Sequence, residues 1–180
     1  LNTRNESIIR KVLENYPHKS EKVKAIEREY QLLSEIHSAF VVRPIELFTH
    51  ENNYVLALED IGGITLKNYL IENTPVTNEQ HLKRTLEIAR QIVLALSDIH
   101  KLNINHFDVN TNNIIYNPAH QLIQLIDFSI AYRSIDNEQA EIEARHVSGT
   151  YAYIAPEQTG RFDRKPDHRS DFYSFGITLY

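Results

Sequence analysis

The stretch from Asn113 to Asp127 constrains the fold more than any other, because it predicts a hairpin with a polar residue at each end. It reads NIIYNPAHQLIQLID, with apolar runs at Ile114–Tyr116 and Leu122–Ile126 around a polar turn that contains Pro118. Two such runs around a turn are typical of a β-hairpin. Because a hairpin folds back on itself, we expect Asn113 and Asp127 to lie close together.

A third oxygen-bearing side chain, Asp108, lies shortly before this hairpin in the segment HFDVNTNN. Carboxylate and amide oxygens suit Mg²⁺, which binds a few protein oxygens together with phosphate. A carboxylate beside such a site can orient a hydroxyl and accept its proton. The pattern therefore indicates a phosphate-handling site. The alternative is that Asp108 and Asn113 only form turns, as such residues often do.

The composition narrows the class of protein. The chain has 180 residues, of which 42% are hydrophobic and 24% charged, as in a soluble globular domain. Its net charge of −5 gives no electrostatic reason to expect nucleic-acid binding. Its apolar runs fall short of the roughly 20 residues of a membrane span. The absence of Cys excludes disulfides and thiolate metal sites, and we expect a cytoplasmic location. The His residues show no zinc-ligand spacing.

The local patterns predict an α+β fold in two parts. We expect a strand at Ser7–Leu13, a helix from about Ser20 to His37 and two strands within Phe40–Asp60 around the turn HENN. Ser20 is the expected N-cap of the first helix. The apolar stripe of that helix comprises Val23, Ile26, Tyr30 and Leu33.

The second half is expected to be mainly helical around the hairpin. The capping-box pattern TNEQ at Thr77–Gln80 opens a long helix. One face of that helix carries Leu82, Leu86, Ala89, Val93 and Leu96. Ser134–Thr150 is predicted to be a long functional loop. A last helix is expected to start near Asp171.

Five short motifs, in the right order, resemble the protein kinase family. HFDVNTNN resembles the catalytic loop H-R-D-L-x-x-x-N, DFS at Asp127–Ser129 resembles D-F-G, and APE at Ala155–Glu157 matches A-P-E. IIRKVL resembles the V-A-I-K strand, and SDFYSFG resembles the start of the helix after A-P-E. The resemblance covers nearly the whole chain and implies a bilobal kinase-like fold.

By this resemblance the chain is incomplete at both ends. It starts with Leu1, contains no Met and has no Gly-rich phosphate loop, so we interpret it as partial. Residues 1–60 would be part of the small lobe, from a strand through helix αC to the hinge. Residues 61–180 would be part of the large lobe, with the catalytic loop, metal-binding hairpin, activation segment and start of helix αF. We expect this fragment alone to be inactive.

The resemblance also implies roles for individual residues, with ATP and Mg²⁺ as cofactors. Lys11 would touch the α- and β-phosphates and pair with Glu29 of the first helix. Asp127 and Asn113 would bind Mg²⁺, and Asp108 would be the catalytic base. Taken alone, Lys11 reads as an exposed strand lysine and Glu29 as a helix-surface charge.

Further positions follow from the same resemblance. LALEDIGG would be the hinge, where backbone groups of Glu59 and Ile61 meet adenine and Leu58 is the gatekeeper. Thr150 stands where serine/threonine kinases carry the Thr that contacts the catalytic loop. His106 is expected to be a packed scaffold residue.

Three positions depart from the family pattern. The Arg that normally precedes the catalytic Asp and receives a phosphorylated activation loop is Phe107, which implies activity independent of such phosphorylation. The catalytic Lys that neutralises the γ-phosphate is Asn110, which bears on the rate of transfer. The Gly of D-F-G is Ser129.

The implied function is transfer of the γ-phosphoryl group of ATP to Ser or Thr hydroxyls of a protein substrate. The segment GTYAYIAPEQTGR…DHRSDFYSFG is similar to the N-terminal kinase domain of large bacterial hybrid sensor histidine kinases that also carry an ATPase domain. Such a parent would be a signalling protein. The main alternative is a pseudokinase or regulatory ATP-binding module, which Asn110 and Phe107 favour. Thr150 and the A-P-E segment argue against a kinase of small molecules.

Overall fold

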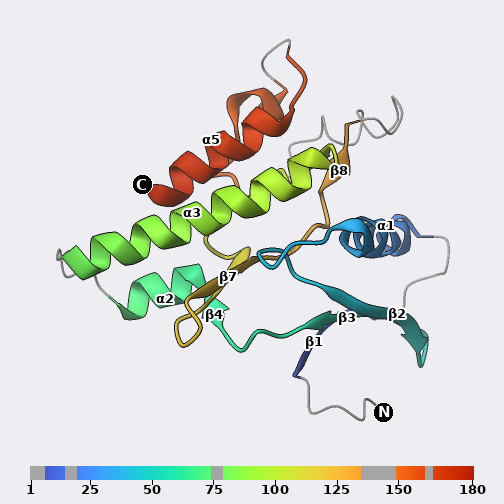
Figure 1. Ribbon diagram of the computed structural model, residues 1–180. Coiled ribbons are helices and arrows are strands. Elements are labelled where there is room, and N and C mark those ends of the chain that lie inside the picture. Colours follow the sequence, from blue (N-terminus) through green and yellow to red (C-terminus); the bar gives the residue numbers. More distant parts are fainter. Residues whose placement is uncertain (1–6, 15–19, 74–78, 135–148, 161–163) are drawn as a thin grey trace.

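The computed structural model describes residues 7–14, 20–73, 79–134, 149–160 and 164–180, and it shows a mixed α and β architecture. The elements run β1, α1, β2, β3, β4, α2, α3, β5, β6, β7, β8, a 3₁₀ turn and α5. A sheet with α1 occupies one side of the molecule, and the long helix α3 with α5 occupies the other (Figure 1). The predicted α+β class is confirmed.

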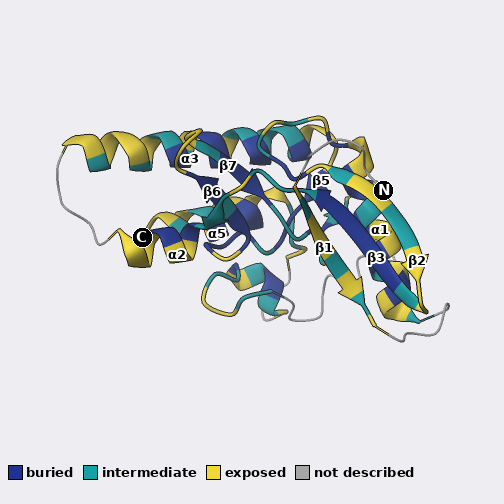
Figure 2. Cartoon of the chain, turned by 90° about the horizontal axis from the view of Figure 1, so that it is seen from below, coloured by how far each residue is buried: buried dark blue, intermediate teal, exposed yellow. Residues whose placement is uncertain are grey.

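The first sheet is antiparallel, with strand order β1-β3-β2. It comprises β1 (Ile8–Leu13), β2 (Pro44–His50) and β3 (Asn53–Glu59). The central strand β3 is largely buried, whereas the edge strand β1 has only exposed and half-buried residues (Figure 2). The register places Lys11 of β1 opposite Leu56. The strands expected around Ser7–Leu13 and the HENN turn are therefore present.

Helix α1 (Glu21–Glu35) begins where the sequence predicts and ends two residues earlier than expected. The Ser20 side chain accepts a hydrogen bond from the backbone N–H of Val23, which caps the first turn. Val23, Ile26 and Leu33 are buried, and this packing fixes which side of the helix faces the rest of the protein.

The predicted hairpin is formed by β6 (Ile114–Asn117) and β7 (Leu122–Leu125). It joins the short strand β4 (Ile64–Thr65) in a second sheet of order β4-β6-β7. Backbone hydrogen bonds from Val42 N–H to Leu125 O and from Leu125 N–H to Phe40 O connect the hairpin to the segment after α1. The first sheet and the hairpin are thereby held in a defined relation.

The remaining elements surround this hairpin. Helices α2 (Leu66–Glu72) and α3 (Glu79–Lys101) precede it, and β5 (Ile104–Asn105) pairs with β8 (Tyr132–Arg133). A 3₁₀ turn at Pro156–Thr159 leads to α5 (His168–Leu179), which packs along α3 (Figure 1). Sequence patterns did not predict α2, β4, β5 or β8. Helix α5 starts three residues earlier than expected, and Asp167 caps it.

Helix α3 buries a different face from the stripe that the sequence singled out. Leu82 and Leu86 are 58% and 60% exposed, and Val93 is also exposed. The buried face instead carries Ile88, Gln91, Ile92, Ala95, Leu96 and Ile99. Of the predicted stripe only Leu96 is fully buried, because it lies where the two faces meet.

Two predictions fall partly outside the described residues: Thr77 and Asn78 of the capping box at Thr77–Gln80, and most of the loop Ser134–Thr150. Within the described part of the chain, no helix combines the length and the apolar character needed to cross a membrane.

Candidate active site

Lys11, Glu29 and Asp127 meet in an ion-pair triangle, although they come from β1, α1 and the end of the hairpin. The Lys11 ammonium lies 2.8 Å from Glu29 Oε2 and 2.8 Å from Asp127 Oδ1. The Glu29 side chain is 1% exposed, whereas those of Lys11 and Asp127 are 37% and 40% exposed. The predicted pairing of Lys11 with Glu29 is therefore present, and the open side of the triangle is formed by Lys11 and Asp127.

The charges of the triangle shift the pKa values of its members. Burial alone would lower the pKa of Lys11, but the Glu29 charge and the hydrogen bonds to Asp127 and Glu29 raise it. Burial works against ionised Asp127, yet the hydrogen bond and charge of Lys11, aided by Ser129, lower its pKa. Burial raises the pKa of Glu29 despite the opposing charge of Lys11. Lys11 and Asp127 thus remain an ion pair over a wide pH range.

The base of the hairpin places Asp127 beside Asn113, as the sequence predicted. The backbone N–H of Ile126 donates to Asn113 O at 2.9 Å, which joins the two ends of the hairpin. Asp127 itself has a positive φ of 61°, a conformation that L-residues rarely adopt. The following residue, Phe128, is buried, and its N–H donates to Glu29 Oε1 at 3.1 Å. Tertiary contacts on both sides therefore hold Asp127 in place.

The Asp108 carboxylate lies at the centre of a second group, the Asp108 cluster, which comprises Asp108, Asn110, Asn113 and Thr150. Asn113 Nδ2 donates to Asp108 Oδ2 at 2.7 Å, and Asn110 Nδ2 donates to Asp108 Oδ1 at 3.0 Å. The Thr150 N–H also donates to Oδ1, at 2.8 Å. Among the described residues, no cation lies within ion-pair distance of Asp108. Neutral donors alone orient this carboxylate.

A buried carboxylate that sequence reasoning missed holds the loop that carries Asp108. Asp171, at the start of α5, is completely buried and accepts hydrogen bonds from the N–H groups of His106 and Phe107 at 2.9 and 2.7 Å. His100 Nε2 lies 2.8 Å from its Oδ2. The sequence marked Asp171 only as a helix start. A useful signal would have been an acidic residue directly beside the aromatic residues of SDFYSFG.

His106 is a scaffold residue, as predicted. Its ring is fully buried and packs edge-on against Phe128, with ring centroids 4.6 Å apart. Nε2 lies 3.0 Å from Ile126 O, and Nδ1 accepts the N–H of Asp108 at 3.2 Å. The ring therefore connects the loop of residues 106–113, here called the catalytic-type loop, to the hairpin.

Phe107 occupies an apolar environment where the family pattern has an Arg. It is 4% exposed, has a φ of 63° and stacks on Tyr132 with ring centroids 6.1 Å apart. Its carbonyl accepts a hydrogen bond from the buried Gln158 side chain at 3.0 Å. This position therefore has no charge to offer a phosphate group.

The predicted hinge lies at the end of β3. Leu58 is 7% exposed, and Glu59 N–H donates to Arg43 O at 3.0 Å. Ile61 O accepts a hydrogen bond from the Asn117 side chain, so one lone pair of this carbonyl is already used. The adenine-binding roles of Leu58, Glu59 and Ile61 stay predictions.

The donor set at the hairpin base fits a hard cation. Because the Asn113 amide nitrogen is committed to Asp108, its side-chain oxygen is the atom left to act as a ligand. Asp127 contributes a carboxylate whose Oδ1 contacts Lys11 and the Ser129 N–H. One carboxylate and one amide oxygen match the sparse protein ligation of Mg²⁺, which usually also binds phosphate oxygens and water.

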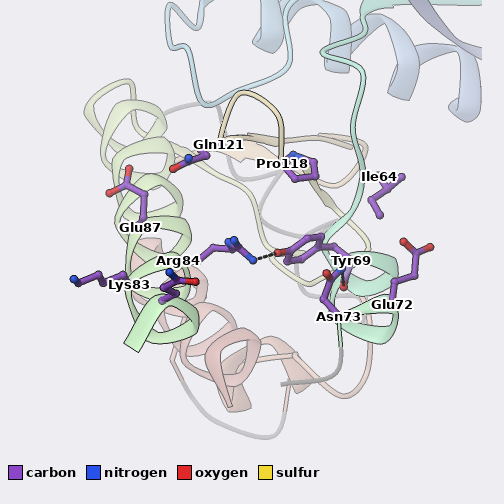
Figure 3. A pocket seen from close by; sticks show the side chains of 10 residues that line it. Ile64, Tyr69, Glu72, Asn73, Lys83, Arg84, Glu87, Pro118 and Gln121 are labelled. Atoms are coloured by element: carbon purple, nitrogen blue, oxygen red, sulfur yellow. Dashed lines mark hydrogen bonds between the residues drawn. The ribbon is translucent and has the colours of Figure 1, made fainter. Parts of the chain in front are cut away.

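A separate pocket of about 700 Å³ lies between α2, α3 and the hairpin turn (Figure 3). Arg84 points into it and donates to the Tyr69 hydroxyl at 2.8 Å. The other lining residues are Ile64, Glu72, Asn73, Gln80, Lys83, Glu87, Pro118 and Gln121. None of the triangle or of the Asp108 cluster lines it, so we do not assign the chemistry to this pocket.

Comparisons with known proteins agree with this geometry. The sequence matches the protein kinase domain family over residues 1–180. It is 30% identical to serine/threonine-protein kinase PrkC of Bacillus subtilis over 92% of this chain and 24% of that protein. It is 31% identical to a probable serine/threonine-protein kinase of Clostridium acetobutylicum over 98% of this chain and 26% of that protein.

A third relative is serine/threonine-protein kinase pkn3 of Myxococcus xanthus, which is 35% identical over 69% of this chain and 23% of that protein. The chain thus spans about a quarter of the length of these relatives. The family match extends over residues 1–180, and the motifs and the mixed α and β architecture agree with it. The chain therefore belongs to the protein kinase family.

Proposed function

We propose that the protein transfers the γ-phosphoryl group of ATP, with Mg²⁺, to Ser or Thr hydroxyls of a protein substrate. The observation that carries this proposal is the double engagement of Asn113. Its amide nitrogen orients the Asp108 carboxylate, and its backbone is joined to the hairpin end that holds Asp127. The Asp108 carboxylate, which can accept a proton, is thereby held beside oxygen atoms that can bind a cation. Phosphoryl transfer to a hydroxyl requires both.

Each residue of the site has a role in this proposal. Lys11 binds the α- and β-phosphates, and Glu29 keeps its ammonium group in position. Asp127 and Asn113 would hold Mg²⁺, which would supply positive charge to the phosphate groups. Asp108 orients the acceptor hydroxyl and accepts its proton. The adenine of ATP, at the end away from the γ-phosphate, contacts the hinge residues Leu58, Glu59 and Ile61.

The wider setting is also part of the proposal. Residues 1–60 and 61–180 belong to the small and large lobes, and the protein acts in the cytoplasm as part of a larger bacterial signalling protein. Attached ATPase or histidine-kinase domains are the partners expected from the similarity of residues 149–176 to that subgroup. The names of the three bacterial relatives support Ser and Thr as acceptors.

A second candidate function is a regulatory module that binds ATP without transferring phosphate. The uncharged environment of Asp108 favours it, because Asn110 and Phe107 remove two positive charges that the family normally places there. The complete ion-pair triangle and the oriented Asp108 carboxylate oppose it.

Transfer of label from γ-labelled ATP to a mixed protein substrate distinguishes the two candidates. With the full-length protein we expect Mg²⁺-dependent label on Ser and Thr, abolished by EDTA and restored by added Mg²⁺. Binding of Mg·ATP without any transfer would favour the regulatory module. Label on Tyr alone would contradict the proposed acceptor class.

A further inference from the structure

The strand β8 lies beside the C-terminal end of helix α1 (Figure 1), where its Arg133 contacts Glu35, the last residue of that helix. Arg133 Nη2 donates to Glu35 Oε2 at 2.6 Å, across 98 positions of sequence. The Arg133 side chain is 19% exposed, whereas that of Glu35 is 54% exposed. The last turn of α1 has no basic residue of its own. Because the C-terminal end of a helix carries a partial negative charge, Arg133 supplies the cation that this end favours.

A second observation distinguishes this contact from an ordinary surface ion pair. The Nε–H of Arg133 is buried and has no acceptor, and no other buried side-chain nitrogen or oxygen lacks a partner in the part of the chain that the structure describes. A buried donor without an acceptor is unfavourable. Stability alone therefore does not explain an Arg at this position. Its buried stem brings the guanidinium to Glu35, at the expense of a hydrogen bond for Nε.

The strand that carries Arg133 is fixed to the catalytic-type loop. β8 pairs with β5, and β5 leads directly into residues 106–113. Tyr132, the neighbour of Arg133, stacks on Phe107 of that loop with ring centroids 6.1 Å apart. Successive side chains of a strand point to opposite faces, so Tyr132 contacts the loop while Arg133 contacts α1. Arg133 thereby connects α1 to the loop that carries Asp108.

The end of α1 matters because the same helix carries Glu29. Glu29 precedes Glu35 by six residues, which is fewer than two turns of an α-helix. Backbone hydrogen bonds connect each of these turns to the next, so a contact that fixes the end of the helix also restrains Glu29. Glu29 lies 2.8 Å from the Lys11 ammonium and accepts the N–H of Phe128 at 3.1 Å. A tilt of α1 would move Glu29 away from both partners.

We propose that Arg133 is a positioning residue, which fixes the end of α1 relative to the catalytic-type loop and so keeps Glu29 in contact with Lys11. The effect on ATP rests on the proposed function, in which Lys11 binds its phosphates. Arg133 acts only through Glu35 and α1. Its loss should weaken binding of Mg·ATP and leave kcat nearly unchanged, because the hydrogen bonds around Asp108 do not involve α1.

Titration calorimetry of the full-length protein with Mg·ATP tests this role. Arg133→Met and Glu35→Gln should each raise the dissociation constant by about 2- to 5-fold, the range of a partly exposed ion pair. Because both changes break the same contact, the double variant should lose no more than either single variant. Arg133→Lys should recover most of the affinity, since the contact uses one nitrogen and is not bidentate.

Glu21→Gln is the matched control. It breaks the Glu21–Lys24 pair, which has the same 2.6 Å distance but lies at the opposite end of α1. This variant should keep the wild-type dissociation constant and kcat. A loss of overall stability of this size would leave nearly all molecules folded, so it would not by itself change the dissociation constant.

Hydrogen exchange gives a readout that needs neither ATP nor activity. The amide hydrogens in the last turn of α1, followed in a peptide of residues 31–36, should exchange about 2- to 5-fold faster in Arg133→Met than in the wild type. The same acceleration is expected in Glu35→Gln, and none is expected in Glu21→Gln.

The two experiments separate the role of Arg133 from the proposed function. Absence of Mg·ATP binding in the wild type would refute the function, while hydrogen exchange would still decide whether Arg133 holds α1. Unchanged exchange in both Arg133→Met and Glu35→Gln would overturn that contact. In a wild type that binds Mg·ATP, an unchanged dissociation constant in both variants, or an equal increase in Glu21→Gln, would overturn the positioning role.

Discussion

The ion-pair triangle and the Asp108 cluster lie on either side of the hairpin base, yet they are assembled in opposite ways. The triangle joins charged groups from a strand, a helix and the hairpin end, with Lys11 between two carboxylates. The Asp108 cluster brings only neutral N–H donors to a single carboxylate. The triangle thus depends on attraction between charges, and the Asp108 cluster depends on the geometry of its hydrogen bonds.

The difference has a physical reason. Coulomb attraction between Lys11 and its partners acts over several ångströms and tolerates small displacements, but it changes with protonation. A hydrogen bond weakens steeply when its geometry changes, so the Asp108 cluster depends on an undisturbed loop. We expect changes in the triangle to affect binding of Mg·ATP, and changes in the Asp108 cluster to affect the rate of transfer.

The largest effect is expected from Asp127→Asn. This change removes a carboxylate that contacts Lys11 and that we propose as a metal ligand. Mg²⁺-dependent turnover of the full-length protein should therefore fall to background. Titration calorimetry with Mg·ATP and a transfer assay measure the two effects. Glu79→Gln, which removes an exposed carboxylate on α3, is the control. Unchanged affinity and rate would remove Asp127 from the site.

Asp108→Ala should affect the other region. We expect kcat to fall by about 10²- to 10⁴-fold, the usual contribution of a general base, while the affinity for Mg·ATP stays nearly unchanged. Comparison of kcat with the dissociation constant for Mg·ATP checks this split. A variant with full activity would show that Asp108 is not the base.

Glu29→Gln should have a smaller effect, which combines weaker binding of Mg·ATP with a loss of stability. The amide keeps an acceptor for Phe128 N–H, but Lys11 loses a charged partner. Because Lys11 is partly exposed and still contacts Asp127, the loss of unfolding free energy should be below the ~3–5 kcal/mol of a fully buried pair. Urea denaturation measures it, with the exposed Glu27→Gln on the same helix as control. Equal losses in both variants would contradict the role of Glu29.

Phosphatase treatment should leave the activity of the full-length protein intact. Phe107 stacks on Tyr132 and presents no charge to a phosphorylated segment, so dephosphorylation removes no contact at this position. Ser134 and Ser148 are the nearest candidate sites, and Ser148 lies outside the described residues. A transfer assay before and after treatment decides the point. A large loss that maps to either Ser would refute the prediction.

The smallest effect concerns pH. The pKa of Lys11 is raised above its ordinary 10.5, so its contribution to stability is complete below that value and is lost as the pH rises through the raised pKa. The difference in melting temperature between wild type and Lys11→Met should therefore be constant from neutral pH to about 10.5 and shrink above it. A difference that already shrinks near neutrality would mean that burial lowers this pKa.

The sequence alone determined the parts of the site that depend on local structure. The approach of Asn113 to Asp127 follows from hairpin pairing between neighbouring segments, and the Ser20 cap follows from hydrogen bonding within one turn. The Lys11–Glu29 pair was inferred from motifs shared with kinases, and the structure contains it. These features need only short-range geometry or a recognised pattern.

Only the tertiary structure decided the features that depend on distant partners. Helix α3 has two apolar faces, and packing selected the one with Ile92 and Ile99 over the one with Leu82 and Leu86. Asp171 became the anchor of the catalytic-type loop because α5 places it against backbone groups 64 and 65 residues away. Periodicity and residue type show which side chains are able to be buried or to bind. Which of them do so is set by long-range contacts, which a local pattern does not contain.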